Sequence, residues 1–236
     1  MIDLNVLATG SSGNCFVLND GNEILLLDAG ISIKDIKVGI NFEVSKIVGA
    51  VVTHCHADHS KAVKDLKNMG VQVFTPYTRK DDAPTVKTRC GKYSISAFSL
   101  TDNEGKPTHS NSDGTPCKVY GFYITHEDFE DWNLVYITDT MYCRYTFENI
   151  KNMIIGTNYK KEKLEDTNLI QKFHVLTGHC SIDTTKDIIK ANNPSNMVML
   201  SHLSLNHADE EEFLSEAKTV AKCDVYVATA GLKINL

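Results

Sequence analysis

The stretch that most constrains this chain is residues 53–60, Thr-His-Cys-His-Ala-Asp-His-Ser, which places three imidazoles and one carboxylate within six residues. An apolar run at 47–52 leads directly into this metal-box segment and predicts a buried strand. Residues 60–69 carry apolar side chains on one face and lysines on the other, which predicts a helix. The polar cluster therefore lies where a strand passes into a helix, and in open α/β folds that edge of the sheet binds ligands.

The spacing within this cluster suits a metal ion. His54 and His56 are two residues apart, so in extended backbone their side chains project to the same side. Asp58 and His59 follow where the chain turns and can face the same volume from another direction. Neutral imidazole and carboxylate are ligands for zinc, manganese or iron. The alternative is a histidine-rich surface loop, but the whole chain of 236 residues has only nine histidines. The pattern favours metal binding by all four side chains.

Length, charge and cysteine usage narrow the class of protein. A chain of 236 residues predicts one domain, residues 1–236, with a large core. We find no signal peptide and no apolar run long enough for a membrane span, and seven scattered cysteines suit reduced thiols. We therefore expect a cytoplasmic protein with no membrane partner. The net charge of −6 argues against broad attraction to nucleic acid, but two bound divalent cations would reverse the sign of a local cleft.

Strands and helices are expected in a layered order. We expect a loop at 81–92, marked by Pro84 and Gly91. Strands first, then helices, then strands again predict an α/β fold with two sheets. The expected strands are 4–8, 15–19, 23–27, 71–75, 93–98, 118–125, 132–137 and 198–200, and the further expected helices are 31–42, 184–191 and 208–221.

The order His-x-His-x-Asp-His after a strand resembles the metallo-β-lactamase superfamily. This resemblance implies a four-layer αββα sandwich with a binuclear metal site. The segment 28–30, Asp-Ala-Gly, is similar to the superfamily's first motif, whose aspartate supports the metal-box loop and is not itself a ligand. Residues 11–14 allow two interpretations: backbone N–H groups and hydroxyls that face a phosphate, or an ordinary glycine-containing hairpin loop.

The same resemblance implies the remaining ligands by their order in the chain. His109 would complete a three-histidine set, Asp139 would bridge both metals, and His202 would be the last ligand. Lactamases tend to carry a cysteine near the position of Asp139, so the aspartate indicates the wider hydrolase groups. Open positions for hydroxide and substrate are typical of a catalytic site. The implied sets are His54, His56, His109 and Asp139 on one metal, and Asp58, His59, Asp139 and His202 on the other.

His179, in the segment Gly-His-Cys-Ser at 178–181, narrows the function. In the nuclease branch of the superfamily, which includes ribonuclease Z, a Gly-His-x-Ser/Thr motif lies between the bridging aspartate and the last histidine, and its histidine helps to protonate the departing oxygen. We therefore expect two catalytic residues: Asp58 orients the hydroxide and takes its proton, and His179 donates to the leaving oxygen. The alternative for His179 is a structural histidine in a helix-capping loop. His126, His174 and His207 are expected to fill surface or core positions.

Further segments resemble one nuclease group of the superfamily, the YycJ/WalJ-type proteins. The resemblance implies a cytoplasmic DNA nuclease, exonuclease-type, with two divalent ions, zinc or manganese, and with DNA rather than RNA as the partner. No long insertion resembles the arm with which ribonuclease Z holds tRNA. One rival is a small-molecule hydrolase acting on a thioester, lactone or cyclic phosphodiester, and another is a non-catalytic metal-binding protein. The segments are 9–14, 28–30, 157–159, 178–181 and 201–204.

Overall fold

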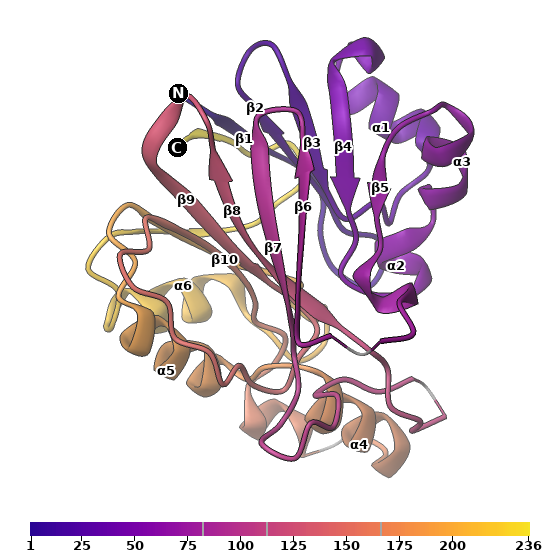
Figure 1. The fold of residues 1–236 in the computed structure, drawn as a ribbon. Coiled ribbons are helices and arrows are strands. Elements are labelled where there is room, and N and C mark those ends of the chain that lie inside the picture. The colour runs from indigo at the N-terminus through magenta and orange to yellow at the C-terminus, as the bar shows by residue number, and fades with distance from the viewer. Residues whose placement is uncertain (82, 112, 166) are drawn as a thin grey trace.

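The structure, a computed structural model, describes residues 1–81, 83–111, 113–165 and 167–236. Its strands form two sheets that face each other (Figure 1). The first sheet has the order β13-β1-β2-β3-β4-β5, with β1 (Asp3–Ala8), β2 (Cys15–Asn19), β3 (Ile24–Leu27), β4 (Ile47–Val51), β5 (Val73–Phe74) and β13 (Lys233–Asn235). The second has the order β12-β11-β10-β9-β8-β7-β6, with β6 (Thr85–Cys90), β7 (Tyr93–Ser99), β8 (Tyr120–His126), β9 (Phe129–Ile137), β10 (Asn152–Gly156), β11 (Met197–Ser201) and β12 (Asp224–Val227).

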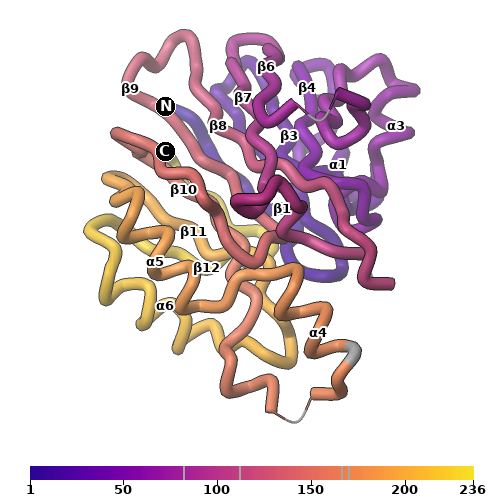
Figure 2. Tube along the Cα trace, turned by 60° about the horizontal axis from the view of Figure 1, so that its bottom comes forward, coloured from indigo at the N-terminus to yellow at the C-terminus, as the bar shows by residue number. Residues whose placement is uncertain are grey.

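Helices cover the outer faces of the two sheets. Figure 2 shows α1 and α3 on one side of the molecule and α5 and α6 on the other. Within the described ranges the helices are α1 (Ile33–Gly39), α2 (Ala57–Ser60), α3 (Val63–Asn68), α4 (Leu169–Gly178), α5 (Ile182–Asn192) and α6 (Glu210–Lys218), and short 3-10 turns lie at Val44–Lys46, Pro76–Thr78 and Lys161–Leu164. The four-layer αββα sandwich expected from the sequence is confirmed.

Strand β2 illustrates why a strand that is buried on both faces has a continuous run of apolar residues. Phe16 and Leu18 point into the core between the two sheets, while Cys15 and Val17 point to the helices α1 and α3. Because side chains alternate between the faces of a strand, a sheet buried on both sides needs apolar residues at every position. The second sheet is covered in the same way, with Phe213 of α6 packed on its outer face.

The loop expected at 81–92 is wrong for residues 85–90, which form the edge strand β6. Gly91, with φ of 54°, makes the tight turn that pairs Cys90 with Tyr93. Pro84 and Gly91 therefore flank a strand. Exposed and half-buried side chains alternate along β6 up to the buried Cys90, so its apolar pattern is weak.

One helix prediction needs correction, and one helix was missed. The helix expected at 60–69 is divided into α2, which begins at Ala57, and α3. Helix α4 was not predicted, because several of its large apolar side chains face outward and give no amphipathic pattern directed at a core. Among the described residues, no helix combines the length and apolar character needed to cross a bilayer.

Candidate metal centre

The candidate ligands gather at one edge of the two sheets because the strands that precede them run parallel. Strands β3 and β4 are parallel, and so are β9, β10 and β11. Carboxyl ends of parallel strands meet at the same edge of a sheet. His54 follows β4, Asp139 follows β9 and His202 follows β11. In Figure 1, α2 lies near mid-height on the right and α4 lies at the bottom, on either side of this edge.

The structure brings together all seven side chains that the superfamily resemblance implies. They form two groups in which the ligand atoms all lie within 4.8 Å of one another. The groups share Asp139, as a bridging carboxylate requires. The two groups are therefore able to bind metal ions, while the individual ligand roles stay a prediction. The groups are His54, His56, His109 and Asp139, and Asp58, His59, Asp139 and His202.

Asp28 holds the metal-box segment in place by hydrogen bonds. Its Oδ2 accepts from Nδ1 of His59 at 2.7 Å and from the hydroxyl of Tyr136 at 2.6 Å. The Thr53 hydroxyl donates to the same carboxylate and lies 3.0 Å from Nδ1 of His54, so it accepts from that nitrogen. Nε2 of His54 is then left buried, with no hydrogen-bond partner among the described residues. A buried lone pair with no protein donor fits a metal ion, and ligands of metals are held in this way through their other nitrogen.

The other two histidines of the first group are oriented in the same manner. His109 Nδ1 donates to the carbonyl oxygen of Gly178 at 2.8 Å, which turns its Nε2 toward His56 Nδ1, 3.2 Å away. His56 Nε2 donates to the Asn111 side-chain oxygen at 2.9 Å. Each imidazole therefore offers its remaining nitrogen to the same volume. Asn111 was not singled out in the sequence, since a lone asparagine in a polar loop carries no pattern.

Two glycines of the motifs are required by close backbone approach. A Cβ on Gly30 would lie 1.7 Å from the carbonyl oxygen of Asp58. Ala29 N–H donates to the His59 carbonyl at 2.8 Å, so the turn after β3 packs directly on α2. A Cβ on Gly178 would lie 2.8 Å from Nδ1 of His109. At both positions only glycine fits, because the neighbouring ligand-bearing segment occupies the space that a Cβ would need.

Three site residues at strand ends have left-handed backbone. Their φ angles are 57° at Asp28, 43° at Asp139 and 56° at His202. Left-handed backbone costs roughly 1–2 kcal/mol for a residue with a Cβ, although aspartate tolerates it better than most. Such conformations gather where function fixes the direction of a side chain. Here all three residues carry polar side chains of the site and lie just after a strand.

The electrostatics of the site favour neutral imidazoles at His54 and His109 and positive charge near the carboxylates. Burial lowers the pKa of His54 well below its usual value and that of His109 to about 3, so both keep their lone pairs. Burial alone would raise the pKa of Asp139, but the imidazoles of His202 and His59 outweigh it and lower that pKa well below the usual range. Burial would lower the pKa of His59, but the carboxylates of Asp139 and Asp28 raise it well above the usual value. The carboxylates thus draw positive charge into the site.

His179 reaches the site but lies outside both ligand groups. Its Nδ1 is 3.6 Å from Asp139 Oδ1, and its ring stacks on that of His202 with centroids 5.4 Å apart. The side chain is held between α4 and α5, where Ser181 caps the second helix by accepting from Thr184 N–H. His174, to which the sequence assigned no role, lies on α4 with its ring centroid 5.7 Å from that of His179. The missed helix α4 explains why His174 was overlooked.

The remaining polar partners come from segments that resemble the YycJ/WalJ-type group. Asn158 donates to the carbonyl oxygen of His202 at 2.9 Å. The Asn14 side chain lies 3.1 Å from Nε2 of His59, and the Thr9 hydroxyl accepts from His202 N–H at 2.9 Å. These segments therefore support candidate ligands. His126 and His207 lie away from the two ligand groups, as expected.

The fold and the site define the class. Residues 8–73 match the family model of the metallo-beta-lactamase superfamily. Solved structures of the same fold include the metallo-beta-lactamase fold protein YhfI from Bacillus subtilis, at 16% identity and TM-score 0.66, covering 100% of both chains. The short form of human tRNase Z has TM-score 0.58 and 13% identity, with 99% of this chain and 98% of that chain covered. The resemblance to this superfamily, recognised from the metal-box segment, is confirmed by these matches.

A full-length relative is similar to this chain in sequence as well. The exodeoxyribonuclease WalJ of Streptococcus pneumoniae serotype 2 (strain D39) is 26% identical over 247 residues. That match covers 94% of this chain and 90% of the relative. The same relative from S. pneumoniae strain R6 matches to the same extent. The resemblance to the YycJ/WalJ-type group therefore extends over nearly the whole chain.

Proposed function

We propose that this protein is a binuclear metal-dependent phosphodiester hydrolase that degrades nucleic acid, as an exonuclease acting on DNA. The observation that carries the proposal is His179, a buried imidazole 3.6 Å from the shared carboxylate of Asp139 and outside both ligand groups. A site that only held metals would not need it. The similarity to an exodeoxyribonuclease supports the same class of substrate.

The two ligand groups would hold two divalent ions, zinc or manganese. Such ions supply Lewis-acid stabilisation of a phosphodiester and make water a nucleophile at neutral pH. Burial would raise the pKa of Asp58, but hydrogen bonds from His202 and His59 outweigh it and lower that pKa, so Asp58 is a carboxylate at neutral pH. Asp58 therefore orients the attacking water and accepts its proton. His179 donates a proton to the departing oxygen.

Residues from both ends of the chain contribute to this site, and we infer that residues 1–236 act as one domain. His54 follows a strand of the first sheet and His202 a strand of the second. Separating the sheets would divide both ligand groups. All seven cysteines are unpaired, which supports a reducing, cytoplasmic setting.

The test is activity on DNA with defined ends. Purified protein, loaded with zinc or with manganese, is incubated with single- and double-stranded DNA labelled at the 5′ or the 3′ terminus. We expect stepwise loss of nucleotides from one end, and the label position gives the polarity. A His126→Ala variant, altered far from the site, is the matched control and should keep the activity. Intact DNA in both metals would contradict the proposal.

A second candidate is a small-molecule hydrolase on the same site. The net charge of −6 favours it, since a polyanion is repelled by an acidic surface. A fold neighbour with TM-score 0.60 and 12% identity is described as a diphosphatase from the PhnP family; it covers 100% of this chain and 98% of its own. Thioesters, lactones and cyclic phosphodiesters assayed beside DNA separate the two candidates. Turnover of one of these compounds with DNA left intact would favour the second.

A further inference from the structure

A groove of about 290 Å³ lies beside the candidate metal centre. One wall is the segment after His109, and the other is helix α4. This volume is at the lower limit of ordinary ligand pockets, so the groove suits one ring system and not a duplex. The described residues that carry the argument are Ser110, Asn111 and Asp113 on one wall and Leu169, Phe173 and His174 on the other.

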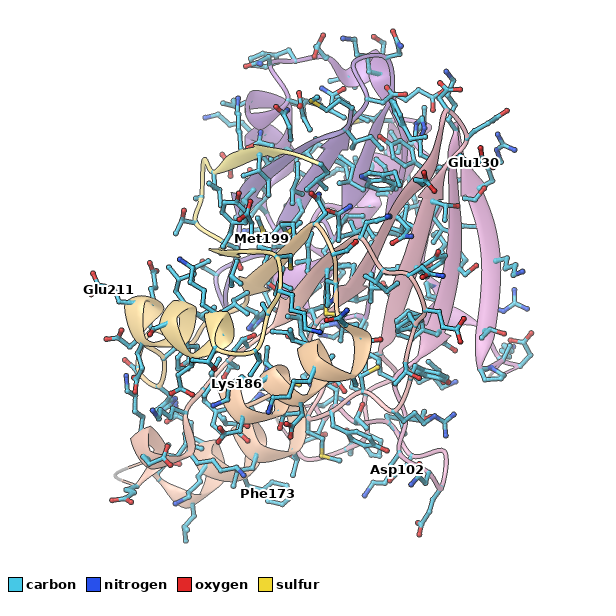
Figure 3. The ribbon with its side chains drawn as sticks, turned by 90° about the vertical axis from the view of Figure 1, so that its left-hand side faces the viewer. Asp102, Glu130, Phe173, Lys186, Met199 and Glu211 are labelled. Atoms are coloured by element: carbon cyan, nitrogen blue, oxygen red, sulfur yellow. The ribbon has the colours of Figure 1, made fainter. Side chains whose placement is uncertain are left out.

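Helix α4 exposes large apolar side chains to solvent beside this groove. Phe173 is 59% exposed and Leu169, one helical turn away, is 84% exposed. Figure 3 shows Phe173 on α4 at the lower end of the molecule. Exposed apolar side chains that line a groove and lie next to each other mark a binding surface more often than scattered ones do.

The groove borders the candidate metal centre. Asn111, on one wall, accepts a hydrogen bond from the candidate ligand His56 at 2.9 Å. His174, on the other wall, has its ring 5.7 Å from the ring of His179. Residues on both walls therefore contact residues of the candidate site.

The charge of the groove selects against phosphate. Among its described lining residues there is no lysine or arginine, and Asp113 contributes a carboxylate. That carboxylate already accepts from the Thr115 hydroxyl, which keeps it on the wall. An anionic backbone would be repelled here, whereas an uncharged aromatic ring finds apolar faces and a hydrogen-bond acceptor for amino groups.

We propose that this groove binds the nucleobase attached to the phosphodiester at the metal centre, with the base stacked on the ring of Phe173. The proposal rests on the proposed function and adds the part of the substrate that is recognised. Base–aromatic stacking tolerates every base, so the groove would serve a nuclease without sequence preference. Because a paired base cannot leave its stack without cost, single strands and frayed ends would be favoured.

The experiment compares two single-stranded oligonucleotides of equal length, one natural and one abasic at the two terminal nucleotides of each end. Phe173→Ala should raise KM for the natural strand roughly 5- to 100-fold, the range that loss of one base–aromatic stack gives, with kcat kept. The abasic strand should show no change, and Phe173→Trp should keep the wild-type KM. Phe42→Ala is the matched control, because Phe42 is 69% exposed and lies beyond α1, far from the site.

The outcomes separate the groove from the proposed function. If wild type cleaves the natural strand and Phe173→Ala leaves its KM unchanged, the base site is overturned and the nuclease stands. If wild type cleaves neither strand, the nuclease proposal has failed, and fluorescence anisotropy of the same strands tests the groove. A wild-type binding preference for the natural strand that Phe173→Ala abolishes supports the base site, and equal binding of both strands overturns it. A wild-type dimer that Phe173→Ala dissociates would assign the groove to a second copy and also overturn it.

Discussion

His54 and His126 are both buried histidines that face carboxylates, at opposite ends of the sheets. Strand β8 connects the two regions: Tyr120 N–H at its start donates to the carbonyl of Thr53 at 3.1 Å, and His126 lies at its end. The cluster around His126 also brings two carboxylates, Asp20 and Asp128, within metal-ligand reach. By residue type alone the two clusters would pass for the same kind of site.

The two clusters differ in the hydrogen bonds that the ring nitrogens of their histidines make. Nδ1 of His126 accepts from the backbone N–H of Asp128 at 3.2 Å, so Nε2 carries the proton and donates to Asp20 at 3.2 Å. Asp128 pairs with Lys92. At His54, by contrast, Nε2 has no hydrogen-bond partner among the described residues. Nε2 of His54 thus keeps a buried lone pair that fits a metal ion, whereas both ring nitrogens of His126 have partners within the protein.

The largest effect is expected for Asp139→Ala, which removes the carboxylate shared by both ligand groups. We expect loss of bound metal and a loss of activity of at least about 10³-fold, because both ions lose a ligand. Elemental analysis of the purified protein and the DNA assay measure the two losses. His126→Ala is the control from the other cluster and should keep both metals. Full metal occupancy in Asp139→Ala would show that Asp139 does not bridge the two metals. The contrast between the two clusters would then no longer hold.

His179→Ala should come next. It removes the proton donor but no ligand, so both metals should stay while turnover falls by roughly 10²–10⁴-fold, the usual contribution of a general acid. Metal content and kcat on DNA are the readouts. His126→Ala, from the cluster at the other end of the sheets, is the control and should keep kcat. Unchanged turnover in His179→Ala would leave this histidine with a structural role only.

Removal of the metals by a chelator should destabilise the protein. A ligand present at 100 times its Kd stabilises the folded state by about 2.7 kcal/mol, which for a chain of this length is roughly 5–10 °C in Tm. Thermal unfolding before and after chelation measures the shift, and added zinc or manganese should restore it. His126→Ala should show the same shift from a lower starting Tm. A chelator-sensitive Tm that depended on His126 would place a metal in the structural cluster instead.

The smallest effect concerns acid stability at the structural cluster. Burial would raise the pKa of Asp20, but hydrogen bonds from the backbone N–H groups of Glu23 and Asn22, together with His126, outweigh it and lower that pKa. A carboxyl with a lowered pKa in the folded state contributes stability above its unfolded pKa, near 4, and loses it as pH falls through the folded value. Urea unfolding between pH 7 and pH 3 should therefore show a smaller acid-induced loss for Asp20→Asn than for wild type, by less than about 1 kcal/mol. Equal losses would mean that Asp20 is not stabilised by these partners.

Much of the site could be predicted because its ligands lie in short motifs with fixed spacing. The metal-box segment could be recognised from local geometry alone, since His54 and His56 come from one extended stretch that leads into a helix. The groove beside the site could not be predicted in the same way. Its Phe173 lies on α4, a helix whose exposed apolar side chains follow a pattern that the sequence does not distinguish from a loop or a core segment.

The sequence by itself determined which residue types can bind a metal and, through parallel strands followed by polar turns, at which edge of the sheets they gather. The tertiary structure decided which of those side chains keep a free lone pair. His54 and His126 are chemically identical in the sequence, and their difference arises from partners distant in the chain: Asp28 acting through Thr53 for one, Asp20 for the other. Hydrogen-bond satisfaction depends on contacts across the fold, so no local pattern could supply it.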